Sequence, residues 1–236
     1  LVSLVLGLKG MPAAGEEVLI GRDIDLAEAT DGRLHVMHVS TAGGVALIRA
    51  AKARGARVTA EACPHHFTLT DECLRGFDSN FKMSPPLRTT TDVEAIIEGI
   101  VDGTIDCIAT DHAPHALEKK MLELDRAPFG ILGLETAIGL TVTRLVVPGR
   151  IGWPRLVEAM STLPARILGV NRGTLRPGAV ADITLIDPEI FWRVDAKTFA
   201  SKSVNTPFHG WTLQGRAVVT IVAGRVKYRL REPAFV

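Results

Sequence analysis

The sequence has little cysteine, no excess of either charge and no apolar run long enough to span a membrane. Its three cysteines, Cys63, Cys73 and Cys107, are spaced like neither a CxxC zinc site nor a disulfide scaffold, which favours a reducing, cytoplasmic setting. With 27 Lys+Arg against 26 Asp+Glu, the formal net charge is +1, which argues against a nucleic-acid partner. Gly10 and Pro12 interrupt the apolar start of the chain, and no export signal is visible, so no membrane partner is expected.

Three common catalytic motifs are absent as well. The sequence contains no GxSxG, no P-loop and no GxGxxG, which removes the usual serine hydrolase, nucleotidase and dinucleotide-binding interpretations. What remains is the composition of an ordinary folded protein, with 47% hydrophobic and 22% charged residues in 236 positions.

Apolar periodicity predicts alternating strands and helices in the first part of the chain. Helices are expected over residues 16–30, 41–55, 89–103 and 133–146, and strands over residues 34–40, 57–63 and 104–111. In the third of these helices, Thr91 and Glu94 have the spacing of a capping box. This alternation predicts an α/β fold with a parallel sheet covered by helices, of which the commonest closed form is the (β/α)8 TIM-type barrel.

The pattern changes after Asn171, where Gly and Pro mark turns and the helical period is lost. Residues 216–229 predict a β-hairpin that turns near Ala223 and Gly224. We therefore expect a partial (β/α) barrel catalytic domain over 1–172 and a small C-terminal β module over 173–236. The first part is shorter than the roughly 200 residues of a small barrel, so only part of a barrel is expected here.

Polar side chains follow the predicted strands at their carboxyl ends, where TIM-type barrels place their chemistry. His38 lies near the end of the first strand, Asp111 ends the third, and His112 and His115 come next in a loop stiffened by Pro114. An imidazole and a carboxylate at one mouth could hold a metal, and the carboxylate could also move a proton. The alternatives are a hydrogen-bonded core histidine, a capping aspartate and solvated histidines.

Other residues give weaker signals. His65 and His66 are adjacent, so their side chains are expected to diverge and a structural role is favoured for both, as for His35. Ser84 could hydrogen-bond a small polar substrate, and Arg88 could bind a carboxylate or brace its loop. Residues 112–130 form a long polar loop, either a lid or an ordinary solvated loop. The cysteines at 63 and 107 are expected to be buried and inert.

Five segments in order carry a resemblance: HVST at 38–41, TAEACPHH at 59–66, FKMSPPLR at 81–88, IATDHAPH at 108–115 and APFGILGLET at 127–136. Together they closely resemble dihydroorotase of the bacterial pyrimidine-pathway type, within the amidohydrolase superfamily. The resemblance implies a hydrolase with one or two Zn²⁺ ions in the complete protein. It also implies the reversible conversion of dihydroorotate and carbamoyl aspartate in de novo pyrimidine biosynthesis, at the mouth of a distorted barrel.

The same resemblance assigns roles to single residues. His38 and Asp111 match metal ligands, and Asp111 also matches the catalytic proton shuttle. His115 matches a substrate-binding histidine, while Phe129 and Gly130 match a pair whose backbone touches the pyrimidine ring. Ser84 stands where many family members carry a substrate-binding Asn, so a contact made there must be shorter or bridged by water.

The front of the chain departs from the family pattern. The chain begins with Leu1 rather than Met, no HxH pair occurs, and the resemblance places that pair, a bridging ligand and another histidine ligand upstream. The chain alone is therefore expected to be inactive. Two alternatives stay open: a hydantoinase-like or allantoinase-like hydrolase, and an inactive dihydroorotase-like scaffold for aspartate carbamoyltransferase. A small-molecule substrate is the expected partner, and a homo-oligomer is also left open.

Overall fold

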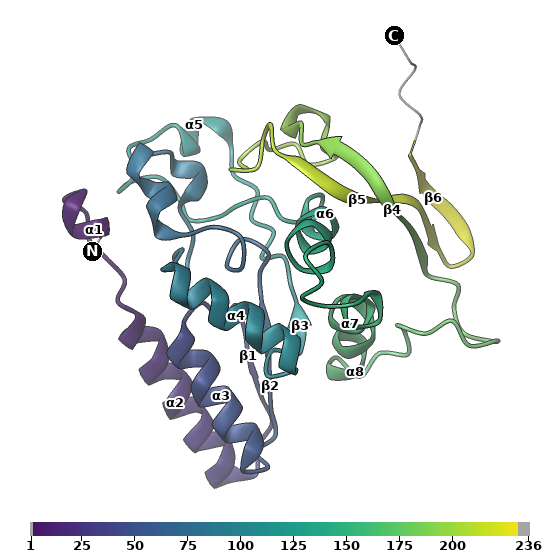
Figure 1. Ribbon diagram of the computed structural model, residues 1–236, viewed down its shortest axis with the longest axis horizontal. Helices are drawn as coiled ribbons and strands as arrows, with labels where there is room; N and C mark the ends of the chain where they lie inside the picture. Colours follow the sequence, from purple (N-terminus) through teal and green to yellow (C-terminus); the bar gives the residue numbers. More distant parts are fainter. Residues whose placement is uncertain (1, 231–236) are drawn as a thin grey trace. The chain divides into compact units, whose positions relative to one another are not determined.

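The computed structural model describes residues 2–230 (Figure 1). The described residues form two compact units, each built from two stretches of chain. The first contains residues 2–137 and 195–209, and the second contains residues 138–194 and 210–230. The predicted domain boundary between residues 172 and 173 stays a prediction.

The first unit is an α/β unit with a parallel sheet in the order β1-β2-β3. In this sheet Leu34 lies opposite Val58, and Ala62 lies opposite Ile108. Figure 1 shows the three longest helices, α2, α3 and α4, side by side. The elements are α1 (Val2–Val5), α2 (Ala13–Thr30), β1 (Leu34–Val36), α3 (Ala42–Ala53), β2 (Val58–Ala62), α4 (Thr90–Asp102), β3 (Cys107–Ile108) and α5 (Leu117–Lys120), with 3₁₀ turns at Asp71–Gly76, Ser79–Phe81 and Ala196–Thr198.

The core of this unit comes from the apolar faces of α3 and α4. Buried positions recur every three or four residues, at Val45 and Ile48 in α3 and at Val93, Ile96 and Ile100 in α4. That spacing places them on one face of each helix. Each fully buried Ile contributes about 1.5–3 kcal/mol relative to an exposed one, so these faces hold the helices on the sheet.

A capping box starts α4, but at a different place from the predicted one. The hydroxyl of Thr89 accepts the backbone N–H of Asp92, and the Asp92 carboxylate accepts the backbone N–H of Thr89 at 3.1 Å. The prediction with Thr91 and Glu94 is wrong because the helix begins at Thr90, which leaves Thr91 inside the first turn.

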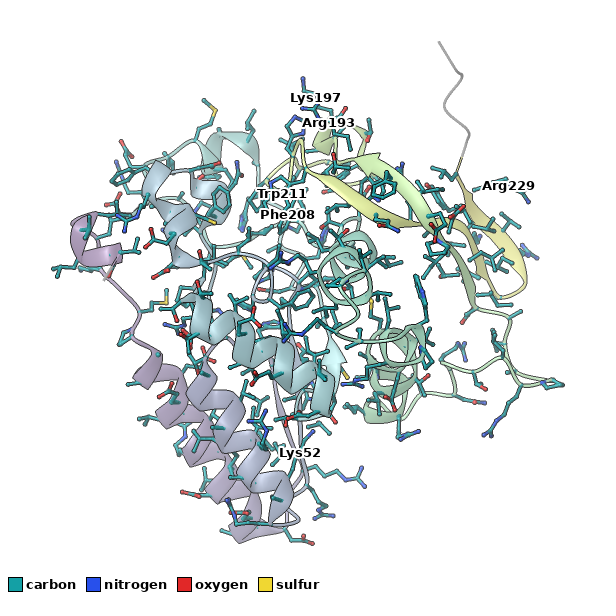
Figure 2. The ribbon with its side chains drawn as sticks, in the orientation of Figure 1. Lys52, Arg193, Lys197, Phe208, Trp211 and Arg229 are labelled. Atoms are coloured by element: carbon teal, nitrogen blue, oxygen red, sulfur yellow. The ribbon has the colours of Figure 1, made fainter. Side chains whose placement is uncertain are left out.

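Two predicted strands are shorter in the structure because the backbone turns where the polar side chains begin. The first ends at Val36, two residues before His38, whose φ is +52°. The third covers only Cys107–Ile108. Before it, Asp106 is fixed by the Nζ of Lys52 at 2.6 Å and by the backbone N–H of Ala60 at 2.8 Å; Figure 2 labels Lys52 on α3.

The second unit contains short helical turns and an antiparallel sheet in the order β4-β5-β6. Its elements are α6 (Ala137–Thr141), a π-helical turn at Val142–Val146, α7 (Trp153–Val157), a second π-helical turn at Glu158–Thr162, α8 (Leu163–Ile167), β4 (Ile183–Arg193), β5 (Thr212–Val222) and β6 (Arg225–Arg229). The predicted helix over 133–146 therefore starts four residues late and changes its pitch. The π-helical end follows the regular turn without a break.

The predicted hairpin is confirmed. β5 and β6 pair around Ala223 and Gly224, whose φ angles of +48° and +75° suit a tight hairpin turn. Arg229 lies on β6, as Figure 2 shows. The predicted α/β fold class with a C-terminal β structure is thus confirmed, with three parallel strands of barrel type in the described residues. Across residues 2–230, we find no helix with the length and apolar character of a membrane span.

Candidate active site

His38 and Asp111 meet at the carboxyl end of the parallel sheet. The Nδ1 atom of His38 lies 4.0 Å from Oδ2 of Asp111, and their side chains are 18% and 28% exposed, so solvent and small molecules can reach both. Both residues have positive φ angles, +52° and +45°. His and Asp are among the non-glycine residues that adopt left-handed backbone most often. The same backbone conformation thus occurs at the two residues whose side chains approach each other.

The carboxylate of Glu61, from β2, lies between two histidines. Its Oε1 is 3.1 Å from Nε2 of His38, and its Oε2 is 3.1 Å from Nε2 of His35. Burial favours the neutral acid, but the hydrogen bonds from both imidazoles outweigh it and lower the pKa of Glu61 to about 2. The same hydrogen bond raises the pKa of His38 against the effect of burial, with a smaller contribution from the charge of Asp111.

This arrangement fixes the tautomer of neutral His38. Ionised Glu61 can only accept a hydrogen bond, so Nε2 of His38 carries the proton. Nδ1, the atom nearer to Asp111, is then left with the lone pair. The basic nitrogen of His38 therefore points toward the carboxylate of Asp111.

Cys63, His65 and His66 form a buried cluster directly after β2. One ligand atom from each side chain lies within 4.8 Å of the others. The two ring centroids are 4.2 Å apart, so the expectation that the imidazoles diverge is wrong. Divergence requires extended backbone, whereas residues 64–68 form a turn that brings both rings to one side.

Burial decides the protonation of this cluster. It lowers the pKa of His65 well below the usual range and that of His66 to about 4, so both rings are neutral at pH 7. His66 donates from Nε2 to the carbonyl of Pro85 at 3.0 Å. Nε2 of His65 and Nδ1 of His66 have no hydrogen-bond partner among the described residues. Burial also raises the pKa of the Cys63 thiol, as expected for an inert cysteine.

His115 contacts the Phe129 loop, by which we mean residues 127–131. Its Nε2 donates to the carbonyl oxygen of Phe129 at 2.7 Å. Gly130 has a φ of +139°, and a Cβ there would lie 2.6 Å from Cβ of Ala113 and 2.8 Å from Nε2 of His115. Glycine is therefore required at 130 for both its backbone conformation and this close approach.

Two lysines hold the Phe129 loop. Lys120, on α5, donates from Nζ to the carbonyls of Pro128 at 3.0 Å and Gly130 at 3.2 Å. Lys82 donates to the carbonyl of Ala127 at 2.6 Å and lies 4.6 Å from the ring centroid of Phe129. Burial, and then the nearby charge of Lys82, lower the pKa of Lys120 to about 8. The last part of the predicted polar loop is therefore tied down at several points.

Asn205 joins this loop to the segment that carries His115. Its Nδ2 donates to the carbonyls of Ala113 at 2.9 Å and Gly130 at 3.1 Å, while its Oδ1 accepts the backbone N–H of His115 at 3.1 Å. The side chain is buried, so three backbone groups depend on it.

Ser84 and Arg88 flank the Pro85-Pro86 turn. Ser84 is exposed, between the buried side chains of Met83 and Leu87. Arg88 pairs with the carboxylate of Glu16 at 3.3 Å and also donates to the hydroxyl of Ser40 at 3.1 Å. These contacts within the chain favour a role for Arg88 in bracing its loop over a role in binding the carboxylate of a substrate.

The sequence predicted that His38 and Asp111 converge, but it did not predict the contact of His115 with Phe129 or mark four further residues as part of the site: Glu61, His65, Lys120 and Asn205. Glu61 could have been noticed as a lone acid within an apolar strand. His65 follows its strand as His38 does, but adjacency to His66 hid it. Nothing in the local pattern marks Lys120, which lies in a charged stretch, or Asn205, far along the chain.

The parallel sheet, with histidine and aspartate gathered at its carboxyl end, has the arrangement in which α/β enzymes of barrel type place their active sites. The chain belongs to the amidohydrolase family, whose model matches residues 21–227. It is 59% identical over 225 residues to a dihydroorotase of Pelotomaculum thermopropionicum, and 56% identical over 228 residues to one of Geobacter metallireducens. These matches cover 95% and 97% of the chain and confirm the resemblance to dihydroorotase.

Solved structures agree with this placement. The L-hydantoinase (dihydropyrimidinase) from Arthrobacter aurescens superimposes with a TM-score of 0.88 at 33% identity, over 93% of this chain and 50% of that one. The dihydropyrimidinase from Brevibacillus agri NCHU1002 gives the same TM-score at 27% identity, over 92% and 49%. The chain also spans only 53% and 54% of the two dihydroorotases, about half the length of the relatives it matches.

Proposed function

We propose that this chain supplies metal-binding and substrate-binding residues to a dihydroorotase, which interconverts dihydroorotate and carbamoyl aspartate in pyrimidine biosynthesis. The observation that carries the proposal is the approach of His38 Nδ1 to Asp111 Oδ2, 4.0 Å, at the carboxyl end of the sheet. The close similarity to dihydroorotases supports the choice of substrate over other cyclic amides.

The residues present fit a zinc ion. His38 offers the Nδ1 lone pair, Asp111 offers a carboxylate, and His65 offers a buried Nε2 that has no partner among the described residues. His65 follows β2, the strand next to β1, so it lies at the same end of the sheet as His38. Two imidazoles and a carboxylate form a usual ligand set for catalytic zinc. When bound, zinc supplies Lewis acidity that polarises a carbonyl and makes water more acidic.

Asp111 is the group proposed to move the proton. Its carboxylate accepts the proton of the attacking water and returns it to the ring nitrogen as the amide bond breaks. Glu61 holds His38 with Nε2 protonated, so that ring keeps one orientation through the reaction. In the reverse direction Asp111 takes the proton from the nitrogen that closes the ring.

His115, Phe129, Gly130 and Ser84 are proposed to bind the substrate. His115 uses Nε2 to hold the carbonyl of Phe129, so it presents Nδ1 to the substrate. Gly130 donates its N–H to the carbonyl of Lys82 and accepts from Lys120 and Asn205. The carbonyl of Phe129 is likewise engaged with His115, so the N–H of Phe129 is the group proposed to make the backbone contact with the pyrimidine ring. The exposed hydroxyl of Ser84 is shorter than the usual Asn and reaches the substrate directly or through water.

A chimera tests the proposal. This chain replaces the region it matches in the Pelotomaculum thermopropionicum dihydroorotase, and turnover is measured with dihydroorotate, hydantoin and allantoin. Turnover of dihydroorotate, lost in Asp111→Asn, is expected. Preference for hydantoin or allantoin would instead select the alternative hydrolases. A folded chimera that hydrolyses none of them, yet co-purifies with aspartate carbamoyltransferase, would select the scaffold.

The chain alone is the second arm of that experiment. No turnover is expected from it, because its sequence contains no HxH pair.

The free thiols of Cys63, Cys73 and Cys107 support the proposed cytoplasmic location. A homo-oligomer stays a prediction.

A further inference from the structure

The cluster after β2 offers more metal ligands than the proposed active site uses. Only His65 belongs to the set with His38 and Asp111, while Cys63 and His66 have no part in that chemistry. All three side chains are buried, with exposed fractions of 0%, 2% and 3% for Cys63, His65 and His66. A buried cysteine, whose thiol releases its proton to solvent as the metal–sulfur bond forms, and two neutral imidazoles are the donor set that zinc-like ions prefer.

The orientation of His66 favours ligation. Its Nε2 donates to the carbonyl of Pro85, which leaves Nδ1 with a lone pair and without a hydrogen-bond partner among the described residues. A backbone carbonyl on the opposite nitrogen is the usual support of a ligating histidine. The unpartnered Nε2 of His65 is the second buried nitrogen of the cluster. A buried acceptor without a donor is costly, and a cation would remove that cost at both rings.

The spacing is close to what a tetrahedral ion requires. Zinc-to-nitrogen and zinc-to-sulfur bonds of about 2.1 and 2.3 Å place neighbouring ligand atoms about 3.4–3.6 Å apart. The three ligand atoms already lie within 4.8 Å of one another, so the site requires rotation of the side chains and no rearrangement of the backbone is proposed. The carboxylates of Glu61 and Asp111 act on the Cys63 thiol, so the surrounding charge also suits a cation.

We propose that Cys63, His65 and His66 form a buried site for a thiophilic divalent cation of the zinc and cadmium class. This site goes beyond the proposed function, although the two share His65. An ion bound here withdraws His65 from His38 and Asp111, so excess thiophilic metal competes with the ion that the active site requires.

The test is a titration of the complete chain with Cd²⁺ alone, followed by the ultraviolet charge-transfer absorbance of cadmium bound to thiolate. One equivalent is expected to produce the band. Cys63→Ser should abolish it, and His66→Gln should weaken binding. Cys107→Ser is the matched control, because Cys107 is also buried and lies on the neighbouring strand β3, and it should keep the band. Absence of the band in the unaltered chain, or its persistence in Cys63→Ser, would overturn the proposal.

Two further measurements keep the proposal testable. If Cys63→Ser fails to fold, ¹¹³Cd NMR of the unaltered chain decides, since a resonance typical of one sulfur and two nitrogen ligands is expected and one typical of oxygen and nitrogen ligands alone refutes the site. His38→Ala should retain the band, and its loss would mean that the cluster is not a separate site. These measurements follow cadmium binding and do not depend on turnover by the chimera. A negative result here therefore contradicts the metal site and leaves the proposed function untouched.

Discussion

Glu61 holds His38 by a contact of 3.1 Å between Oε1 and Nε2, and this contact is the largest cause of the raised pKa of His38. The carboxylate thus contacts one ring nitrogen of His38, Nε2, while the other, Nδ1, lies near Asp111. It favours the protonated ring, and in the neutral ring it leaves the lone pair on Nδ1.

Replacing this carboxylate should change the titration of His38. In Glu61→Gln the hydrogen bond to a charged acceptor is lost, so the pKa of His38 is expected to fall, which an NMR titration of its ring protons measures. The exposed Glu72, paired with Arg75, provides the control, and Glu72→Gln should leave the His38 curve where it was. An unchanged curve in Glu61→Gln would show that Glu61 does not set the protonation of His38.

Asp111→Asn should separate chemistry from folding. Asn is among the residues that best tolerate left-handed backbone, so the φ of +45° at this position is retained at little cost. The amide cannot take a proton from water, so kcat of the active chimera is expected to fall by at least about 10²-fold. Thermal unfolding should stay close to that of the parent. Equal kcat in the two proteins would remove Asp111 from the chemistry.

Asn205→Ala should destabilise the first unit and disturb substrate binding. The change leaves the part-buried carbonyl of Ala113 and the N–H of His115 without this partner, and the buried carbonyl of Gly130 keeps only its hydrogen bond from Lys120. The expected loss is about 2–4 kcal/mol in the free energy of unfolding, measured by urea denaturation. In the chimera KM should rise more than kcat falls, because the substrate-facing segment shifts while Asp111 stays in place. The exposed Asn171 gives the control, and Asn171→Ala should change neither quantity.

The sequence predicted what depends on local periodicity and on chain direction. Helices α3 and α4 and the β5–β6 hairpin lie where apolar spacing and the Ala223-Gly224 turn placed them. The approach of His38 to Asp111 was predictable because parallel strands end on the same side of a sheet. Strand lengths were not, since the apolar pattern continues beyond Val36 and Ile108, where the strands end in the structure.

The supporting residues of the site were harder to predict for a related reason. Lys120 and Asn205 act on backbone carbonyls that any sequence would supply, so no residue pattern marks the partner. The pairing of His65 with His66 depends on a turn where extended backbone was assumed. Positioning contacts of this kind become visible only when the chain is folded.

Lys120 gives the stability of the protein a pH dependence of predictable sign. Its pKa is about 8 in the folded chain against 10.5 for an ordinary lysine, so the unfolded chain binds more protons between these values. Stability should therefore rise as pH increases from 8 to 10.5, by at most about 3 kcal/mol, and no such rise is expected from this group below pH 8. The comparison is with Lys120→Met, which removes the titrating group and should flatten this part of the profile. Urea unfolding at several pH values measures both proteins. Lys197→Met, in the 3₁₀ turn Ala196–Thr198 (Figure 2), is the control that keeps the rise. If Lys120→Met and its parent have the same pH profile of stability, burial does not lower the pKa of Lys120.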